Sequence, residues 1–343
     1  MTPPSTATST RRSVEAARSR PRGQGWLVVL GLLAAVPAVG ATALRIMSPT
    51  GDRLAKLAAF IPYGLVFWLP AAVLLGAAAV RSSRHRTPGR FGTGLLGLAA
   101  TAGLVLALVW HGPAFVADSR PVTTKSLTVV SLNIARLADM EALAEAARGA
   151  DVVVLAEVER TWVWALPDSF RKEFPHLAPV DRVEGSVIFS RHPIGAVEAL
   201  PSSSFQQWAA IVRTPQLGAV RVVAVHPCNP YCGGGLWRSE AERLRTWLDE
   251  RDRSIPTVVA GDFNAVDDHH TMQALYADGF RSAAHLAGAG FVRTWPADRR
   301  FPPVIAIDHV LVDGALTATA FGTFEVPRTD HLGVRAVIAG TAG

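Results

Sequence analysis

Eight polar residues stand where short apolar runs of this 343-residue chain begin or end. A carboxylate, amide or imidazole in such a position can be an ordinary loop residue, but six runs share the pattern. Because the ends of neighbouring strands meet at one edge of a layered sheet, we expect these side chains to line a single cleft. The eight residues are Asn133, Glu157, His226, Asp262, Asn264, Asp308, Asp330 and His331.

These residue types predict a particular chemistry. Carboxylates grouped with amides are the oxygen ligands that a hard cation such as Mg²⁺ prefers, and Mn²⁺ accepts the same set. An added imidazole can move a proton or stabilise developing negative charge. Phosphoryl transfer needs this combination, because the reacting oxygens must be both positioned and neutralised. The cluster therefore indicates a metal-dependent phosphoesterase.

The segments that must position these residues begin near residue 126. From there, short β-branched runs alternate with amphipathic segments, which favours a layered α/β or α+β domain. We expect helices at residues 138–148 and 236–251. The expected strands are residues 126–134, 151–157, 186–190, 208–214, 219–226, 257–261, 305–312 and 334–339.

The order of these motifs resembles that of the endonuclease/exonuclease/phosphatase superfamily. The Gly-Asp-Phe-Asn run at residues 261–264 is the most specific of them. The resemblance covers residues 126–340 and implies a four-layered α/β sandwich, in which two packed β-sheets are flanked by helices. The matching segments are residues 131–134, 155–158, 185–191, 225–227, 261–264, 307–310 and 329–331.

The resemblance also implies a metal site. Glu157 would be the main Mg²⁺ ligand, Asn133 would support the site, and Asp330 would be a further carboxylate on the metal side. Many nucleases of the superfamily carry an acidic residue two places after the first Asn, where this chain has Ala135. The metal shell is therefore expected to hold fewer protein ligands or more water.

The remaining roles concern catalysis. By the same resemblance, Asp262 would orient or deprotonate the attacking water. Asn264 and His226 would hold the phosphoryl oxygens and stabilise added negative charge. Asp308 would orient the imidazole of His331 toward the phosphate. Loss of one oxyanion donor of this kind typically costs about 10²–10³ in rate.

The first third of the chain has a different character. Three apolar stretches lie at about residues 26–44, 57–80 and 91–116. Each contains about 19 or more uncharged residues, enough for a helix to cross about 30 Å of hydrocarbon. Core helices of a soluble domain are the alternative, but three in series with basic flanks favour transmembrane helices.

The positive charges predict an orientation. Arginines cluster before the first stretch and between the second and third, whereas the first loop has a weaker group of Arg45, Arg53 and Lys56. By the positive-inside rule the second loop should be cytoplasmic. Residues 1–25, rich in Ser, Thr, Pro and Arg, are expected to be a disordered cytoplasmic tail. Residues 121–343 would then form a domain outside the plasma membrane.

The two cysteines agree with that orientation. Cys228 and Cys232 lie four residues apart in a segment whose Pro, Asn and Gly content predicts a loop. Outside the membrane, a short disulfide is the expected state. A metal-binding pair is the alternative, and backbone geometry could forbid the bridge.

Charge bears on the substrate. Residues 121–343 carry 21 Lys and Arg against 25 Asp and Glu, a net charge of −4, so the high pI belongs to the N-terminal third. A nucleic-acid-binding domain is expected to carry a basic surface, and this net charge argues against one. Arg293, Trp295 and Arg299 mark an aromatic and basic loop that would suit a lipid phosphate head group. An ordinary exposed loop is the alternative.

The overall plan of three spans and an external domain resembles actinobacterial teicoplanin-resistance proteins of the VanJ type. That resemblance implies hydrolysis of undecaprenyl pyrophosphate at the outer membrane face, which supplies lipid carrier for cell-wall synthesis and relates to glycopeptide antibiotic resistance. One alternative is an extracytoplasmic phosphodiesterase, either a nuclease or a phospholipid-cleaving enzyme. Another is a non-enzymatic membrane sensor, against which the full set of predicted catalytic residues argues.

Overall fold

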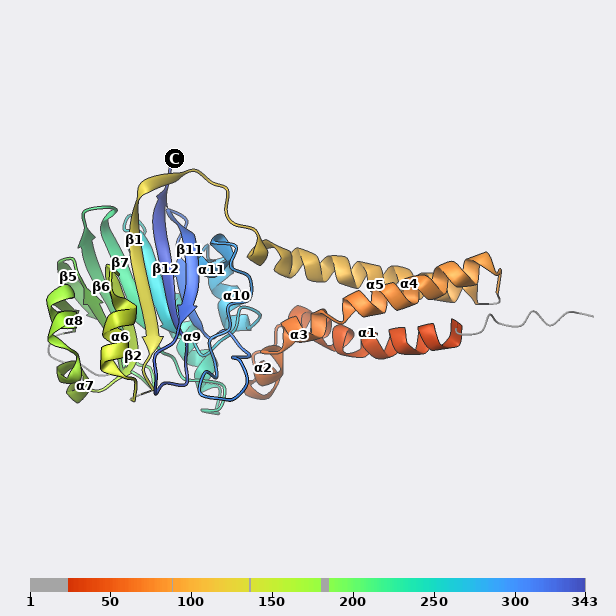
Figure 1. The fold of residues 1–343 in the computed structure, drawn as a ribbon, viewed down its shortest axis with the longest axis horizontal. Coiled ribbons are helices and arrows are strands. Elements are labelled where there is room, and N and C mark those ends of the chain that lie inside the picture. Colours follow the sequence, from red (N-terminus) through yellow and green to blue (C-terminus); the bar gives the residue numbers. More distant parts are fainter. Residues whose placement is uncertain (1–23, 88, 136, 180–184, 343) are drawn as a thin grey trace, which may run out of the picture.

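The computed structural model describes residues 24–342 except residues 88, 136 and 180–184. The N-terminal third forms a rod of helices, and the rest forms a β-sandwich at one end of the rod (Figure 1). The predicted tail therefore lies almost wholly outside the described residues. The helices of the rod are α1 (Gln24–Met47), α2 (Asp52–Ala58), α3 (Ile61–Leu65), α4 (Trp68–Arg84), α5 (Arg90–His111) and the 3-10 helix η1 (Gly112–Phe115).

Three helical stretches are long and apolar enough to cross a membrane, namely Gln24–Met47, Ile61–Arg84 and Arg90–Phe115. They confirm the three candidate spans predicted from the sequence. The second stretch begins later than predicted, because residues 52–58 form the separate helix α2. Large apolar side chains cover the outside of the rod, such as Phe91, which is 80% exposed. Such a surface is suited to lipid.

Small residues let the candidate spanning helices approach closely. A Cβ on Gly64 would lie 2.5 Å from the Cβ of Ala41, and one on Gly103 would lie 2.5 Å from the indole of Trp68. Close packing of this kind is how helices associate in lipid, where no hydrophobic force draws them together. The Trp68 indole also donates a hydrogen bond of 2.9 Å to Thr42 Oγ1.

The first sheet of the sandwich has the strand order β11-β12-β1-β2-β4-β3. The central strands β1 and β2 are parallel, and each outer neighbour runs antiparallel to the strand that it pairs with. The bounds are β1 (Val122–Asn133), β2 (Val152–Val158), β3 (His176–Ala178), β4 (Gly185–Ser190), β11 (Leu316–Phe324) and β12 (Gly333–Thr341).

The second sheet repeats this plan with the order β5-β6-β7-β8-β10-β9. Here β7 and β8 are the parallel pair, and β10 runs antiparallel to β8. The bounds are β5 (Ile194–Ala199), β6 (Trp208–Thr214), β7 (Gly218–Val225), β8 (Thr257–Asp262), β9 (Arg281–Ser282) and β10 (Asp308–Val312).

Helices cover both outer faces of the sandwich. In β1, Val129 points into the core between the sheets and Val130 points outward, as the two-residue repeat of a strand requires. The outer layers are α6 (Met140–Ala147), α7 (Arg160–Ala165) and α8 (Asp168–Glu173) on the first sheet, and α9 (Leu236–Glu250) and α10 (His270–Ala277) on the second. Helix α11 (Ala283–Leu286) closes the inter-sheet core. The predicted four-layered α/β sandwich is confirmed.

This topology gathers strand ends at one edge. The carboxyl ends of β1 and β2 lie side by side, as do those of β7 and β8. Strand β10 enters the second sheet at the same edge, since Asp308 pairs with Asp262. Strand β12 likewise enters the first sheet beside the end of β1, since Val334 pairs with Ser131.

The helical rod contacts the sandwich at the end where α2, α3 and η1 lie, whereas the α4–α5 connection lies at the opposite end (Figure 1). Ala55 of α2 is fully buried in the apolar cluster of α9, α10 and the second sheet. Its carbonyl lies 2.8 Å from Nε2 of the buried His269. The Tyr63 hydroxyl donates a 2.6 Å hydrogen bond to the carbonyl of Val304. The first loop and the sandwich therefore lie at the same end of the candidate spans.

Candidate active site

Two carboxylates and an amide meet where the two sheets face each other. Asn133, at the end of β1, donates from Nδ2 to Glu157 Oε1 at 3.2 Å and to Asp262 Oδ2 at 3.0 Å. Its Oδ1 accepts a 2.9 Å hydrogen bond from Ala135 N, which fixes the amide with its nitrogen toward the carboxylates. Asn133 thus contributes to the site by holding Glu157 and Asp262 together.

Backbone geometry turns the side chains inward. Glu157 and Asn264 have φ values of 58° and 49°, the left-handed region that non-glycine residues rarely adopt. The register of β2 shifts at Glu157, between Leu155 and Val158. Conformations of this kind persist where the surrounding structure enforces them, and they cluster at functional sites.

Gly261 brings β7 and β8 together just before the site. Its φ is 149°, and a Cβ at this position would lie 2.0 Å from the carbonyl oxygen of Val225. Any side chain here would push the two strands apart. The glycine of the Gly-Asp-Phe-Asn run is therefore needed for close strand approach, directly before the carboxylate of Asp262.

His331 and Asp308 form a buried ion pair opposite the carboxylates. His331 Nδ1 lies 2.9 Å from Asp308 Oδ2, and its Nε2 lies 3.8 Å from Asp262 Oδ2. Burial alone lowers the pKa of His331, but the charges of Asp308 and Asp262 outweigh it and raise the pKa to about 10. The ring therefore carries a proton at neutral pH and can donate a charged hydrogen bond.

His226 contributes a second imidazole with the opposite electrostatics. Its ring stacks on Phe205 with centroids 4.3 Å apart, and its Nε2 lies 3.6 Å from Asp262 Oδ2. Its backbone N–H donates to Gln207 Oε1. Burial lowers the pKa of His226 more than the nearby carboxylates raise it, so this ring is neutral. Burial also raises the pKa of Asp262, which makes it a stronger base than an exposed aspartate.

Asn264 and Asp330 complete the predicted set. The backbone N–H of Asn264 donates to Asp262 Oδ1 at 2.8 Å, and one side-chain N–H donates to the carbonyl of Pro227. Asp330 Oδ2 accepts a 2.9 Å hydrogen bond from the indole of Trp295. Its Oδ1 lies 3.9 Å from Nε2 of His331.

One cavity of about 410 Å³ joins these groups, and we call it the catalytic cavity. Asn133 and Asp308 do not line the cavity themselves, but they hydrogen-bond to residues that do. The structure thus brings all eight predicted residues together. The six that line the cavity directly are Glu157, His226, Asp262, Asn264, Asp330 and His331.

The donor set fits a divalent cation. Ligand atoms of Asp262, Asp308 and His331 lie within 4.8 Å of one another, close enough to surround an ion. His331 carries a proton, however, and makes a poor ligand, whereas the carboxylates of Glu157 and Asp262 are held side by side by one amide. Oxygen ligands of this kind are what Mg²⁺ and Mn²⁺ prefer. Asp308 Oδ1 is buried without a hydrogen-bond partner among the described residues, although Oδ2 of the same carboxylate pairs with His331.

The helical rod supplies part of the cavity wall. Lys56 of α2, together with Ala59 and Phe60, lines the catalytic cavity. The Lys56 ammonium lies 3.8 Å from the ring centroid of Tyr231, which also lines the cavity. In the sequence, Lys56 stands out only as one of the few positive charges of the first loop. No local signal marks it, because the predicted site residues that line the same cavity all lie more than 100 positions away.

The two cysteines lie in the loop that borders the cavity. Cys228 and Cys232 form a disulfide, with Cα atoms 6.3 Å apart. The backbone N–H of the buried Cys228 donates to Glu240 Oε2. Asn229 and Tyr231, between the cysteines, line the cavity. The bridge thus fixes a loop that contributes to its wall.

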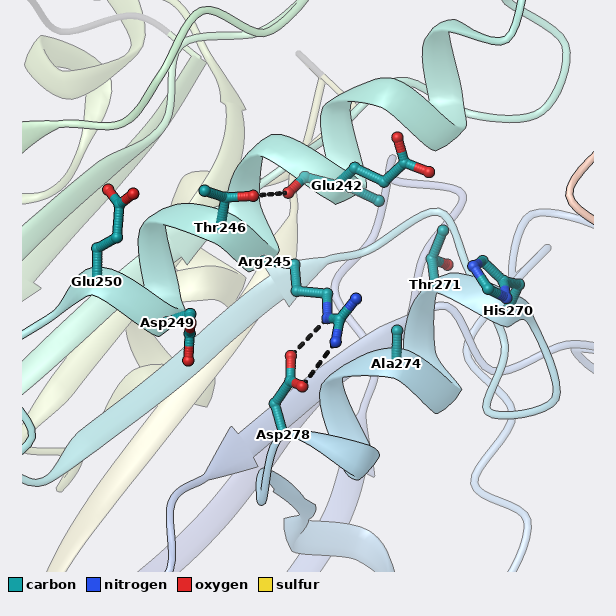
Figure 2. A pocket seen from close by; sticks show the side chains of 10 residues that line it. Glu242, Arg245, Thr246, Asp249, Glu250, His270, Thr271, Ala274 and Asp278 are labelled. Atoms are coloured by element: carbon teal, nitrogen blue, oxygen red, sulfur yellow. Dashed lines mark hydrogen bonds and ion pairs between the residues drawn. The ribbon is translucent and has the colours of Figure 1, made fainter.

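Another hollow lies between α9 and α10 (Figure 2). Its charged side chains engage each other, since Arg245 makes two hydrogen bonds to the carboxylate of Asp278. Glu242, Asp249 and Glu250 also line it. None of the eight strand-end residues borders this hollow, and we assign it no chemistry.

Comparison with known proteins agrees with this site. The model of the Endonuclease/Exonuclease/phosphatase family matches residues 130–331, more than half of the chain. The solved endonuclease/exonuclease/phosphatase of Beutenbergia cavernae DSM 12333 is similar, with 22% identity, a TM-score of 0.51, and coverage of 64% of this chain and 72% of that one. The mannosyl-6-phosphatase of Bacteroides thetaiotaomicron VPI-5482 shows 16% identity, a TM-score of 0.50, and coverage of 62% and 99%. At these identities the likeness establishes the fold. No curated protein matches the chain.

Proposed function

The chain belongs to the Endonuclease/Exonuclease/phosphatase family, whose members are metal-dependent phosphoester hydrolases, and we propose that its substrate is a lipid pyrophosphate such as undecaprenyl pyrophosphate. Hydrolysis would take place at the outer face of the plasma membrane and return the lipid carrier to cell-wall synthesis. One observation carries the choice of substrate. The loop between the first two candidate spans, through Lys56 and Ala59, forms a wall of the catalytic cavity.

This wall favours a membrane lipid over a nucleic acid. A duplex or single strand needs an open basic surface along which several phosphates can bind. Here the cavity is bounded by a helix that leads directly into a candidate span, and residues 121–343 carry a net charge of −4. A lipid pyrophosphate, in contrast, lies at the membrane interface. There a single lysine, Lys56, can neutralise the second of its two phosphate groups.

The protein's own groups suggest how the reaction would proceed. Asp262, whose pKa is raised by burial, would accept a proton from the attacking water. Water oxygen would bond to the terminal phosphorus as the bond to the bridging oxygen breaks, which yields inorganic phosphate and the lipid phosphate. The protonated His331, held by Asp308, would donate to a phosphoryl oxygen as its charge grows.

Two further groups would position the phosphoryl oxygens. The neutral His226 is held by its stacking on Phe205, and Asn264 keeps one side-chain N–H available after donating the other to Pro227. A divalent cation bound by Glu157 and its neighbours would supply positive charge to the reacting phosphoryl group. Fixed donors of this kind need no rearrangement during the reaction.

A substrate panel tests the proposal on the full chain in nanodiscs. The product measured is inorganic phosphate from undecaprenyl pyrophosphate, phosphocholine from sphingomyelin and shortened strands from DNA, each with Mg²⁺ and with excess chelator. We expect turnover of the pyrophosphate only, and only with metal. Turnover of DNA alone would overturn the lipid-carrier proposal, and cleavage of sphingomyelin alone would indicate a phospholipid-cleaving enzyme.

Orientation is tested separately. A reporter fused after Gly343 is expected to behave as extracytoplasmic, as the distribution of positive charge predicts. A cytoplasmic signal would reverse the proposed topology. The substrate would then have to be available at the inner face.

A further inference from the structure

An apolar groove lies beside the catalytic cavity, at the junction of the helical rod and the sandwich. We call it the interfacial groove, and its volume is about 360 Å³. Its lining includes Val66 at the end of α3, Phe115 of η1, and Phe291 and Ile305 of the sandwich. Ligand pockets typically occupy about 300–1,000 Å³, so the size suits part of a small molecule or a hydrocarbon chain.

The groove connects the candidate spans to the catalytic cavity. Ala59 and Ile305 line both spaces, so the two are directly adjacent. At the other end, Val66 is 63% exposed and belongs to the second candidate span. Phe115 is the last residue of the third span and packs edge-on against Phe291. The groove therefore runs from two spans toward the phosphate site.

Arg293, a charged group in the groove wall, donates a 3.4 Å hydrogen bond to the Tyr63 hydroxyl, and the two carboxylates of the wall are engaged by other side chains. Asp267 accepts from His285 and from the Tyr276 hydroxyl. Asp268 lies 2.9 Å from Arg45, with which it forms an ion pair. The remaining surface is mostly apolar, and a peptide backbone placed here would leave its polar groups without partners. A hydrocarbon chain has no polar groups and can pack against this wall without that cost.

We propose that the interfacial groove binds the hydrocarbon chain of the substrate, next to its phosphate. This inference rests on the proposed function, since it assumes a lipid phosphate in the catalytic cavity. The head group must leave the membrane interface to reach Asp262, and the first carbons of the chain must follow. Each CH₂ exposed to water would weaken binding about fourfold. The groove covers these carbons, and so lets the head group reach the carboxylates.

A protection experiment tests the groove without requiring turnover. Ala289 lines the groove and is exposed, and both native cysteines form the disulfide, so Ala289→Cys introduces a single free thiol. Its reaction with a water-soluble maleimide is followed in the full chain with Mg²⁺. The ligands are farnesyl methylenediphosphonate, whose P–C–P bridge resists hydrolysis, and methylenediphosphonate without a chain. Ala315→Cys, in the exposed turn between β10 and β11, is the matched control.

We expect the farnesyl ligand to slow labelling at position 289 at least about fivefold and to leave position 315 unchanged. The chainless ligand should protect neither position. Equal labelling at position 289 with and without the farnesyl ligand overturns the groove. Protection in a protein that hydrolyses no lipid pyrophosphate would uphold the groove and reject the proposed function, so the two failures are distinguishable.

A filled groove gives an independent measure. Ala289→Trp places an indole in the groove, and Ala315→Trp adds the same side chain in the distant turn. For Ala289→Trp, we expect the ratio of kcat/KM for undecaprenyl pyrophosphate over inorganic pyrophosphate to fall at least about tenfold. Ala315→Trp should leave the ratio unchanged. An unchanged ratio in the first variant contradicts chain binding in the groove.

Discussion

The ion pair of Asp308 and His331 allows a quantitative test of the active site. Asp308 is 2% exposed, and its Oδ2 lies 2.9 Å from His331 Nδ1. Burial lowers the pKa of His331, but the neighbouring carboxylates raise it to about 10, so the ring is protonated at pH 8. Asp308→Asn keeps the side-chain size and removes one charge. Because a contacting opposite charge shifts a pKa by about 1–3 units, we expect the pKa of His331 to fall by that amount.

The assay is the pH dependence of kcat/KM for the wild-type chain and the variant. Activity should fall as His331 loses its proton, so the alkaline limb should move about 1–3 pH units lower in Asp308→Asn. A bound divalent cation lowers both pKa values, and the difference between the two proteins is therefore the measured quantity. Asp313→Asn, at the other end of β10, should leave the limb in place. An alkaline limb at the same pH in the wild-type chain and in Asp308→Asn would refute the role of the ion pair.

Three further changes test other parts of the site. Glu157→Ala should abolish Mg²⁺-dependent turnover while circular dichroism stays native, and full activity would reject its role as metal ligand. Lys56→Gln should lower kcat/KM for a lipid pyrophosphate about tenfold or more, because it removes one charged hydrogen bond to the substrate. Arg53→Gln, on the same helix, is the control and should change kcat/KM little. Arg45→Met removes the partner of the buried Asp268, whose pKa burial already raises to about 7, so we expect the carboxyl to protonate and the docking contact to weaken. Hydrogen exchange across α2 should then speed up, and unchanged exchange would show that docking does not need the pair.

The catalytic edge could be predicted because its strands are simple in sequence. Residues 152–156 are buried on both faces of β2, so the strand is an uninterrupted apolar run that ends at Glu157. The same holds for β8, which ends at Asp262. A polar residue that ends one such run can be an ordinary loop residue, but six runs that share the pattern indicate a site. The pattern therefore predicted both the strands and the polar side chains at their ends.

Edge strands gave no such signal. Strands β5 and β11 alternate small, polar and exposed residues, and neither was predicted. At an edge, one side of the strand has no partner, so burial imposes little pattern on the sequence. The short helices α7, α8, α10 and α11 were missed for a related reason, since segments of four to eight residues carry less than three turns of periodicity.

The bounds of helix α2 could not be predicted from local sequence patterns. Hydropathy assigned its last residues to the second span, because Leu57 and Ala58 are as apolar as the residues that follow. Burial of Ala55 within the sandwich and its contact with His269 instead place the helix outside the span. Such contacts join residues more than 200 positions apart. Tertiary packing, not propensity, sets where this helix ends.

This docking gives the candidate spans a role beyond anchoring. Ala59 packs in one buried cluster with Val266 and Ile307, and Lys56 lies in the wall of the catalytic cavity. Removing residues 1–120 would therefore expose apolar surface of the sandwich and open the cavity on the side that faces the rod. A passive tether would leave the cavity complete without it. Since the same loop joins two candidate spans and borders the catalytic cavity, the proposed function would make access from the membrane and completion of the active site depend on one segment.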